Sequence, residues 1–222
     1  MSDEPIDQAL PRGPHDLTRD QVEASQRRRL IAAMTSAVSQ MGYVKTSVAE
    51  VIQRAGVSRA TFYVLFRDKE DCFIQAFDAA TEEIGSAMML GLMESDIDEA
   101  SMDVVERVEA LLEVYLHVLV TYPEVARTFL IEVFAAGPRA IARRRESLNG
   151  FMSLVMETVF SEFEVTPQRT FMVKTVVHAM SSMVTLAVGT NSPEELLQLK
   201  EPLTQLIRDM YQTELFQGPS AS

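Results

Sequence analysis

Residues 47–66 read SVAEVIQRAGVSRATFYVLF, and this stretch decides the fold. Two short segments with helical apolar spacing, 47–55 and 58–65, flank Gly56. Glycine adopts positive φ without steric cost, so Gly56 suits a tight turn between two helices. The apolar side chains that would lock these helices together are Val51, Ala55, Val57, Phe62 and Leu65. The pattern predicts a helix-turn-helix, whose second helix fits a DNA major groove.

The second helix of this pair would present its outward face to DNA. Ser58 is placed to cap the helix, and the face carries Arg59, Ala60, Tyr63 and Val64 beside Thr61. Arg59 is the candidate for reading a base, because its guanidinium fork matches guanine O6 and N7. At the start of the first helix, the hydroxyls of Thr46 and Ser47 suit a phosphate oxygen.

The segment and its flanks resemble the TetR family of bacterial regulators. The resemblance is densest over residues 28–77, in Thr46, Val48-Ala49, Ala55-Gly56-Val57-Ser58, Thr61-Phe62-Tyr63, Phe66 and Lys69-Glu70. It implies nine helices, a homodimer, and phosphate contacts from Tyr63 and Lys69. Leu65 stands where many members have histidine, so one polar contact to the DNA backbone is missing. The predicted DNA-binding residues are Arg28, Thr46, Ser47, Ser58, Arg59, Ala60, Thr61, Tyr63, Val64 and Lys69.

The charge distribution separates a basic end of the chain from an acidic remainder. The formal charge of the 222 residues is −12, yet residues 18–70 hold nine Lys or Arg against five Asp or Glu, which is +4. The remainder therefore carries −16, and DNA would repel it. Only the basic end suits phosphate contact, so the sequence indicates two functions on one chain.

We expect an all-α protein of about nine helices, because no stretch shows the period-2 alternation of a strand. The expected domains are a flexible arm at 1–18, a helix-turn-helix domain at 19–68, a ligand-binding and dimerisation domain at 69–216, and a flexible tail at 217–222. Residues 215–219, Leu-Phe-Gln-Gly-Pro, also resemble a recognition sequence of viral 3C-type proteases. Predicted helix starts fall at Ser101, Pro123, Pro138, Thr166-Pro167 and Ser192, and Pro202 should interrupt the last helix.

The acidic part is rich in Leu, Val, Phe and Met, and the chain has 13 methionines. Flexible methionines suit adaptable apolar ligands, although a plain core explains the same residues. The resemblance favours a pocket for a small, largely apolar effector. Its candidate lining is Phe77, Met88, Leu116, Phe129, Phe134, Phe151, Met152, Val155, His178 and Ser181.

The segment 167–188 is apolar on more than one face, so it needs cover on two sides. One side can pack inward and the other against a second copy, together with the segment that follows Ser192. The predicted dimer residues are Val173, Val177, Met180, Val184, Leu199, Leu203, Leu206 and Met210. A polar stripe of Lys174, His178, Ser181 and Thr185 is either a solvent-facing edge or a polar side of the pocket.

Several classes of function find no support in the sequence. It shows no glycine-rich phosphate loop, nucleophile elbow or zinc-ligand spacing, so we expect no enzyme, cofactor or metal. Its one cysteine, Cys72, reads as core packing. No signal-peptide pattern or apolar run approaching about 18 uncharged residues is evident, so a cytoplasmic location without a membrane is expected. The sequence thus predicts a repressor that binds a palindromic DNA operator as a homodimer and is released by ligand. The alternatives are an activator, a dimeric apolar-ligand carrier without DNA binding, and an all-α enzyme that uses the cavity.

Overall fold

The computed structural model describes residues 18–94, 103–158, 165–190 and 192–212, and every regular element within them is helical. The predicted all-α class is confirmed. Within the described residues all nine predicted helices are present, although the one expected from Pro123 is followed by a separate 3-10 segment and the last one is divided in two. The predicted arm at 1–18, apart from Thr18, and the predicted tail lie outside the described residues.

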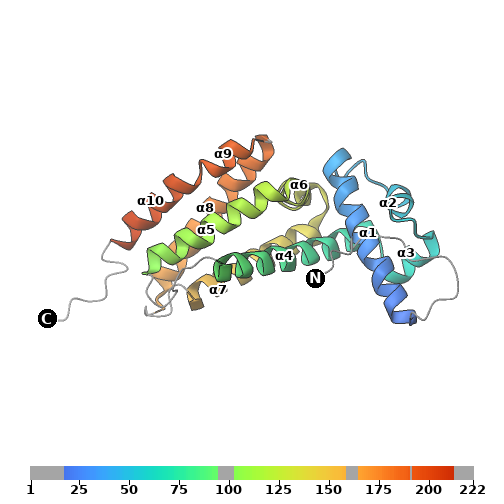
Figure 1. Cartoon of the computed structure of the whole chain (residues 1–222), viewed down its shortest axis with the longest axis horizontal. Coiled ribbons are helices and arrows are strands. Elements are labelled where there is room, and N and C mark those ends of the chain that lie inside the picture. The colour runs from blue at the N-terminus through green and yellow to red at the C-terminus, as the bar shows by residue number, and fades with distance from the viewer. Residues whose placement is uncertain (1–17, 95–102, 159–164, 191, 213–222) are drawn as a thin grey trace.

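Three helices form a headpiece at one end of an elongated molecule (Figure 1). They are α1 (Arg19–Met41), α2 (Val48–Ala55) and α3 (Arg59–Leu65). α1 begins with a capping box, in which Thr18 and Gln21 each accept a hydrogen bond from the other's backbone N–H. This exchange satisfies amide groups that the first helical turn leaves without a partner.

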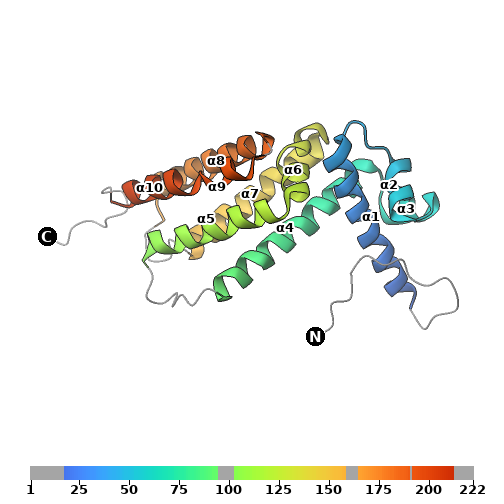
Figure 2. The same ribbon diagram turned by 45° about the horizontal axis from the view of Figure 1, so that its top comes forward.

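A long helix, α4 (Lys69–Glu94), joins the headpiece to the rest of the chain and packs against α1, α5 and α7 (Figures 1 and 2). We call α4 and everything after it the body. The later elements are α5 (Val104–Thr121), α6 (Pro123–Leu130), the 3-10 helix η1 (Glu132–Ala135), α7 (Pro138–Thr158), α8 (Pro167–Thr190), α9 (Pro193–Leu197) and α10 (Lys200–Tyr211).

The predicted helix starts at Pro123, Pro138 and Pro167 are confirmed. α5 differs: Asp103 is its cap, with a carboxylate that accepts from the Glu106 backbone N–H at 2.9 Å, and Ser101 lies outside the described residues. The interruption near Pro202 comes before that residue, between α9 and α10. Pro202 itself lies in the first turn of α10, where its missing N–H removes no intrahelical hydrogen bond.

α8 is long and apolar enough to cross a membrane by length and composition, and it is the one described helix that meets this test. The sequence-based expectation of no such run was therefore wrong. However, α8 packs against α6, α7 and α9 of its own chain. Its remaining apolar surface needs a packing partner, and a second copy of the chain could serve as that partner as well as a membrane could.

Two clusters of buried side chains hold the fold together. The first joins the headpiece to α4, α6, η1 and α7 and contains two groups of contacting rings, Phe62 with Phe66, and Phe129 with Phe73 and Phe77. The second joins α5, α6, α8, α9 and α10 around Leu116, Val184 and Leu203. Cys72 is fully buried in the first cluster, as predicted, and burial raises the pKa of its thiol to about 12.

Candidate DNA interface and ligand cavity

The turn between α2 and α3 has the predicted conformation. Gly56 adopts φ 60° and ψ 38°, the left-handed region in which glycine has no Cβ penalty. The hydroxyl of Ser47 accepts from the Glu50 backbone N–H at 3.1 Å, and that of Ser58 accepts from Thr61 at 3.0 Å. Arg29 of α1 donates to the Ala55 carbonyl at the end of α2. Each end of the turn is thus held by a specific hydrogen bond.

Apolar packing fixes the angle at which α3 is presented. Val51, Ala55, Phe62 and Leu65 are buried, as predicted for the lock between the helices, and Phe66 is buried beside them. Leu65 therefore serves the core. Because this packing fixes the orientation of α3 about its own axis, the opposite face of α3 points outward.

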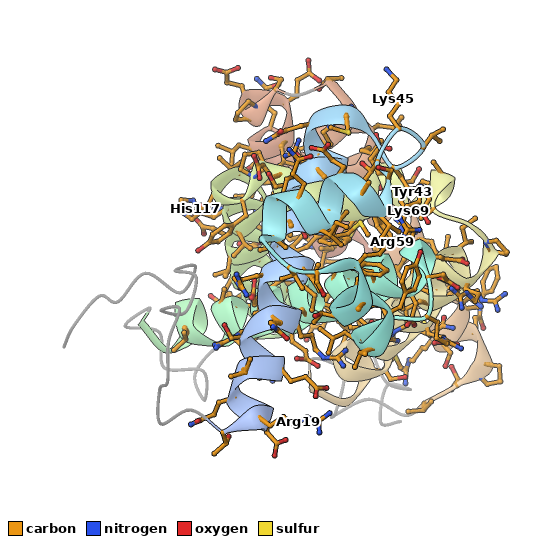
Figure 3. The ribbon with its side chains drawn as sticks, turned by 90° about the vertical axis from the view of Figure 1, so that its right-hand side faces the viewer. Arg19, Tyr43, Lys45, Arg59, Lys69 and His117 are labelled. Atoms are coloured by element: carbon orange, nitrogen blue, oxygen red, sulfur yellow. The ribbon has the colours of Figure 1, made fainter. Side chains whose placement is uncertain are left out.

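That outward face carries Arg59, Ala60, Tyr63 and Val64, all exposed, with Tyr63 at 49% and Val64 at 72%. Figure 3 shows Arg59 at the end of the molecule where the headpiece lies. The Arg59 guanidinium lies 5.5 Å from the Tyr63 ring centroid, and its Nη2 donates to the Tyr63 hydroxyl at 3.4 Å. Thr61 is half-buried, with its hydroxyl 2.8 Å from that of Ser58.

Two predicted phosphate contacts, Thr46 and Lys69, serve the headpiece itself. Thr46 is 1% exposed, and its hydroxyl donates to the Gly42 carbonyl at 2.9 Å, so it is not available to a phosphate. Lys69 Nζ donates to the carbonyls of Tyr43 and Thr46, each at 2.9 Å, and lies 3.9 Å from the Tyr43 ring centroid (Figure 3). Burial lowers the pKa of Lys69. Lys69 thus ties the start of α4 to the loop before α2, and its predicted contact with a phosphate stays a prediction.

Several cations remain on the headpiece surface. Over the described residues, no ion pair engages Arg19, Arg28, Lys45 or Arg59. Arg28 and Arg59 were predicted as DNA contacts, whereas Arg19 and Lys45 were not. Both are exposed, and Figure 3 shows Lys45 projecting away from the ribbon. The loop that holds Lys45 has no motif of its own, so only its position marks it as a candidate.

Polar contacts from η1 and α6 tie the body to the headpiece, and the start of α4 is in turn bound to α7. The Glu132 carboxylate accepts from the Tyr43 backbone N–H at 2.9 Å, and the buried Thr128 hydroxyl donates to the Thr35 carbonyl at 3.2 Å. At the start of α4, Glu70 accepts from the backbone N–H groups of Arg139 and Ala140, at 3.0 and 3.3 Å. Glu70 thereby caps α7, so the base of α4 links the headpiece to α7.

The body contains a partly open apolar cavity of about 600 Å³. Side chains from α4, α5, α6, α7, α8 and α10 line it, and most are aliphatic or aromatic. This volume falls within the range of about 300–1,000 Å³ that is usual for small-molecule sites. A cavity therefore replaces the plain core that was the alternative explanation of these residues.

The predicted ligand residues divide into two groups. The cavity lining includes Phe77, Met88, Phe129, Phe151, Val155 and Ser181. Leu116 and Met152 are not in this lining, and Leu116 is packed in the core. Phe134, 54% exposed, and His178 instead border a second, smaller pocket. Their placement corrects the prediction, because a helical face turns by about 100° per residue and sequence spacing alone does not say which face meets the cavity.

Two polar cavity residues, Tyr115 and Arg144, are not among the residues predicted to bind the ligand. Burial raises the pKa of Tyr115 to about 12. Arg144 donates from Nη2 to the Ser181 hydroxyl at 3.0 Å and to Thr185 at 3.5 Å. Ser181 and Thr185 thus face the protein interior, whereas Lys174 and His178 of the same predicted stripe are exposed. Arg144 stands in a run of three arginines, 143–145, which suits either an anionic ligand group or, as the sequence favours, a solvated helix face.

The predicted dimer residues mostly face inward. Val173, Val177, Val184 and Leu203 are buried within the single chain, so they cannot pack against a partner. Met180 and Met210 line the cavity, Leu199 packs against the second core cluster, and Leu206 is exposed. The outward stripe of α8 consists of other residues, Phe171, Thr175, Ala179, Met183 and Leu186. The sequence correctly indicated that α8 is apolar on two sides, but the residues predicted to meet a partner lie on its inward side.

Comparison with known proteins gives a family match for the headpiece and the start of α4. Residues 30–76 match the family model of bacterial regulatory proteins, tetR family. The HTH-type transcriptional regulator AcrR of Shigella flexneri is 28% identical over 108 residues, which are 48% of this chain and 46% of that protein. The match thus spans about half the length of this relative.

Solved structures share the whole architecture. The fatty acid degradation regulator FadR from Bacillus halodurans superposes with a TM-score of 0.65 at 21% identity, covering 82% of this chain and 93% of its own. The transcriptional regulator FadR from Bacillus subtilis, in complex with stearoyl-CoA, gives 0.63 at 21% identity, covering 81% and 96%. At this identity the similarity establishes the fold alone.

Proposed function

We propose that this chain is a bacterial transcriptional regulator of the TetR family, whose model matches residues 30–76, and that it is a homodimeric repressor that binds a palindromic DNA operator. A small, largely apolar ligand in the body cavity releases it from DNA. The observation that carries this proposal is the exposed face of α3, held outward by a buried lock and rimmed by unpaired cations. The protein acts by binding, without catalysis, in the cytoplasm where the chromosome lies.

DNA recognition divides between base reading and positioning. Arg59 reads a base edge after leaving its contact with Tyr63, and Thr61 adds a methyl or hydroxyl contact. Tyr63 and Ser47 contact phosphates, while Arg28, Arg19 and Lys45 supply charge around them. Ala60 and Val64 are small or apolar enough to lie against the groove floor, where thymine methyls are exposed. The acidic body stays away from the DNA.

Two headpieces must be held about 34–36 Å apart to enter successive major grooves on one face of B-DNA. We assign the holding contact to the outward stripe of α8, in which Leu186 is 71% exposed. Leu186→Glu should yield monomers in equilibrium sedimentation at micromolar concentration, because burying a carboxylate in an apolar interface is costly. Leu90→Glu, at an exposed leucine of α4, is the matched control and should stay dimeric. A wild-type monomer would overturn this assignment.

To release the protein from DNA, a ligand bound in the cavity must move α4. Phe77 and Ile84 of α4 line the cavity, and Asp78 of α4 pairs with Arg143 of α7 at 2.6 Å. A ligand that displaces α4 therefore shifts its N-terminus, where Lys69 holds the headpiece. A coupling free energy of about 1–3 kcal/mol is typical of such responses and is enough to alter occupancy of the operator.

The decisive experiment selects binding sites from a randomised double-stranded DNA library at low salt and sequences them. We expect a palindromic consensus. Arg59→Ala should weaken binding by about 1–3 kcal/mol and relax the preference at one position, whereas Tyr63→Ala should weaken all sequences alike. Arg54→Ala is the control, because its guanidinium is engaged by Glu50 at 2.6 Å and Gln40 at 2.8 Å. Absence of enrichment would contradict the proposal and favour a ligand carrier or an enzyme.

A further inference from the structure

Arg144 is placed unusually for a charged residue. It lies on the wall of the apolar cavity, and no described carboxylate is within ion-pair distance of it. Its Nε is buried and has no hydrogen-bond partner among the described residues. The neighbouring Arg143 also lines the cavity, but it pairs with Asp78 at 2.6 Å and Glu146 at 3.6 Å. Of these two cavity arginines, only Arg144 has a charge that the described protein leaves uncompensated.

The surroundings of Arg144 hold this charge in position. Its guanidinium lies 5.1 Å from the Phe134 ring centroid, and Ser181 and Thr185 accept its Nη2 hydrogen bonds. Burial lowers the pKa of Arg144, and Tyr115, with a pKa raised to about 12, stays a neutral hydroxyl nearby. A desolvated guanidinium without a counter-charge is unfavourable unless an anion joins it. The site therefore has the chemistry to bind a carboxylate, which a guanidinium holds with two parallel hydrogen bonds.

Two hollows of different polarity meet at this residue. Arg144, Leu148 and Ser181 line both the apolar cavity and a second pocket of about 280 Å³. Besides the apolar Phe134 and Leu186, the second pocket adds His178, Ser182 and Thr185, so its lining is more polar than that of the larger cavity. A molecule whose aliphatic part fills the larger hollow and whose charged end stops at Arg144 would match both environments.

We propose that the effector is a long-chain carboxylate, with its aliphatic tail in the body cavity and its acid group on Arg144. This inference rests on the proposed function, in which the cavity is the effector site. Arg144 supplies the charge, Ser181 and Tyr115 supply hydroxyls beside it, and the smaller pocket leaves the head group in contact with polar side chains. Affinity for the acid end should exceed that for a neutral end by roughly 10- to 100-fold, as a charge-assisted hydrogen bond provides.

The test compares three ten-carbon probes that differ only in the head group. Decanoate, decanol and decylamine compete with the neutral dye Nile red for the wild-type protein. We expect decanoate to bind most tightly, decanol roughly 10- to 100-fold more weakly, and decylammonium weakest of all, since Arg144 repels it. Equal affinities of the acid and the alcohol, or no displacement by any probe, would overturn the proposal without the need for a variant.

Variants then locate the preference. Arg144→Gln should bind Nile red and decanol as the wild type does but lose its preference for decanoate, and Arg144→Lys should keep part of it. Arg145→Gln, at the exposed neighbouring arginine, is the matched control and should keep all of it. A preference that survives Arg144→Gln would assign the head group elsewhere. Operator binding without any probe is measured in parallel, so that loss of DNA binding with an intact acid preference refutes the proposed function alone.

Discussion

The headpiece and the body use apolar side chains for opposite purposes. In the headpiece, Phe62 and Phe66 are at most 1% exposed, and their rings are in contact. In the body, Phe151 and Val155 face a cavity of about 600 Å³. A close-packed core is rigid and transmits displacement, whereas a hollow one can change shape around a guest. One chain thus combines a rigid DNA-binding surface with an adaptable ligand cavity, because one core is filled and the other is left open.

Replacing a phenylalanine by alanine should lower the free energy of unfolding far more in the headpiece than beside the cavity. Phe62→Ala should destabilise the protein by about 3–5 kcal/mol, because the packed surroundings cannot collapse into the space left behind. Phe151→Ala, at a side chain that is 43% exposed beside the cavity, should cost less than about 1 kcal/mol. Urea unfolding followed by circular dichroism measures both. Equal losses would mean that the body is packed as tightly as the headpiece.

The contact between the start of α4 and the start of α7 is the next most sensitive place. Gly137 has φ +121°, and a Cβ there would lie 2.7 Å from Oε1 of Glu70, which caps α7. Gly137→Ala should therefore cost about 1–3 kcal/mol. Adding Glu70→Ala removes the clash, so the double variant should lose less than the sum of the single losses. Strict additivity in thermal unfolding would show that the clash is not the cause.

The pH dependence of the free energy of unfolding reports on the burial of Cys72. Burial raises the pKa of Cys72 from 9.0 to about 12, so the folded state keeps the thiol protonated at a pH where the unfolded state releases the proton. Below pH 9 this stabilisation is fully present. It is lost as pH rises towards 12, and the loss amounts to about 1 kcal/mol at pH 10. Cys72→Ala should flatten the stability profile over that window. Rapid alkylation of Cys72 at pH 8 in the native protein would contradict its burial.

The smallest effect is expected on the headpiece surface. Glu50 pairs with Arg54 at 2.6 Å across one turn of α2, and both side chains are partly exposed. Glu50→Gln should change the free energy of unfolding by less than about 0.5 kcal/mol, because solvent screens such pairs. A loss above 1 kcal/mol in urea unfolding would make surface charge, and not the filled core, a main support of the headpiece.

Local features of this protein were readable from the sequence because their causes lie within a few residues. Ser47, Gly56 and Ser58 occupy the predicted capping and turn positions, and each acts on backbone groups of its own segment. Phe62 and Leu65 are buried as their spacing predicted. Pro123, Pro138 and Pro167 begin helices because their ring restricts φ to a helical value and they lack an N–H to donate.

Other features depended on partners far away in the chain. Lys69 ties down a loop 23 to 26 residues before it, and Arg144 faces hydroxyls 37 and 41 residues after it. The sequence showed that 167–188 is apolar on two sides, but the packing of α6 and α7 decided that Val173, Val177 and Val184 face inward. Helix type, caps and turn are set by neighbours along the backbone. Which face is buried, which cation is left unpaired and where a cavity opens are set by elements that only the tertiary fold brings together.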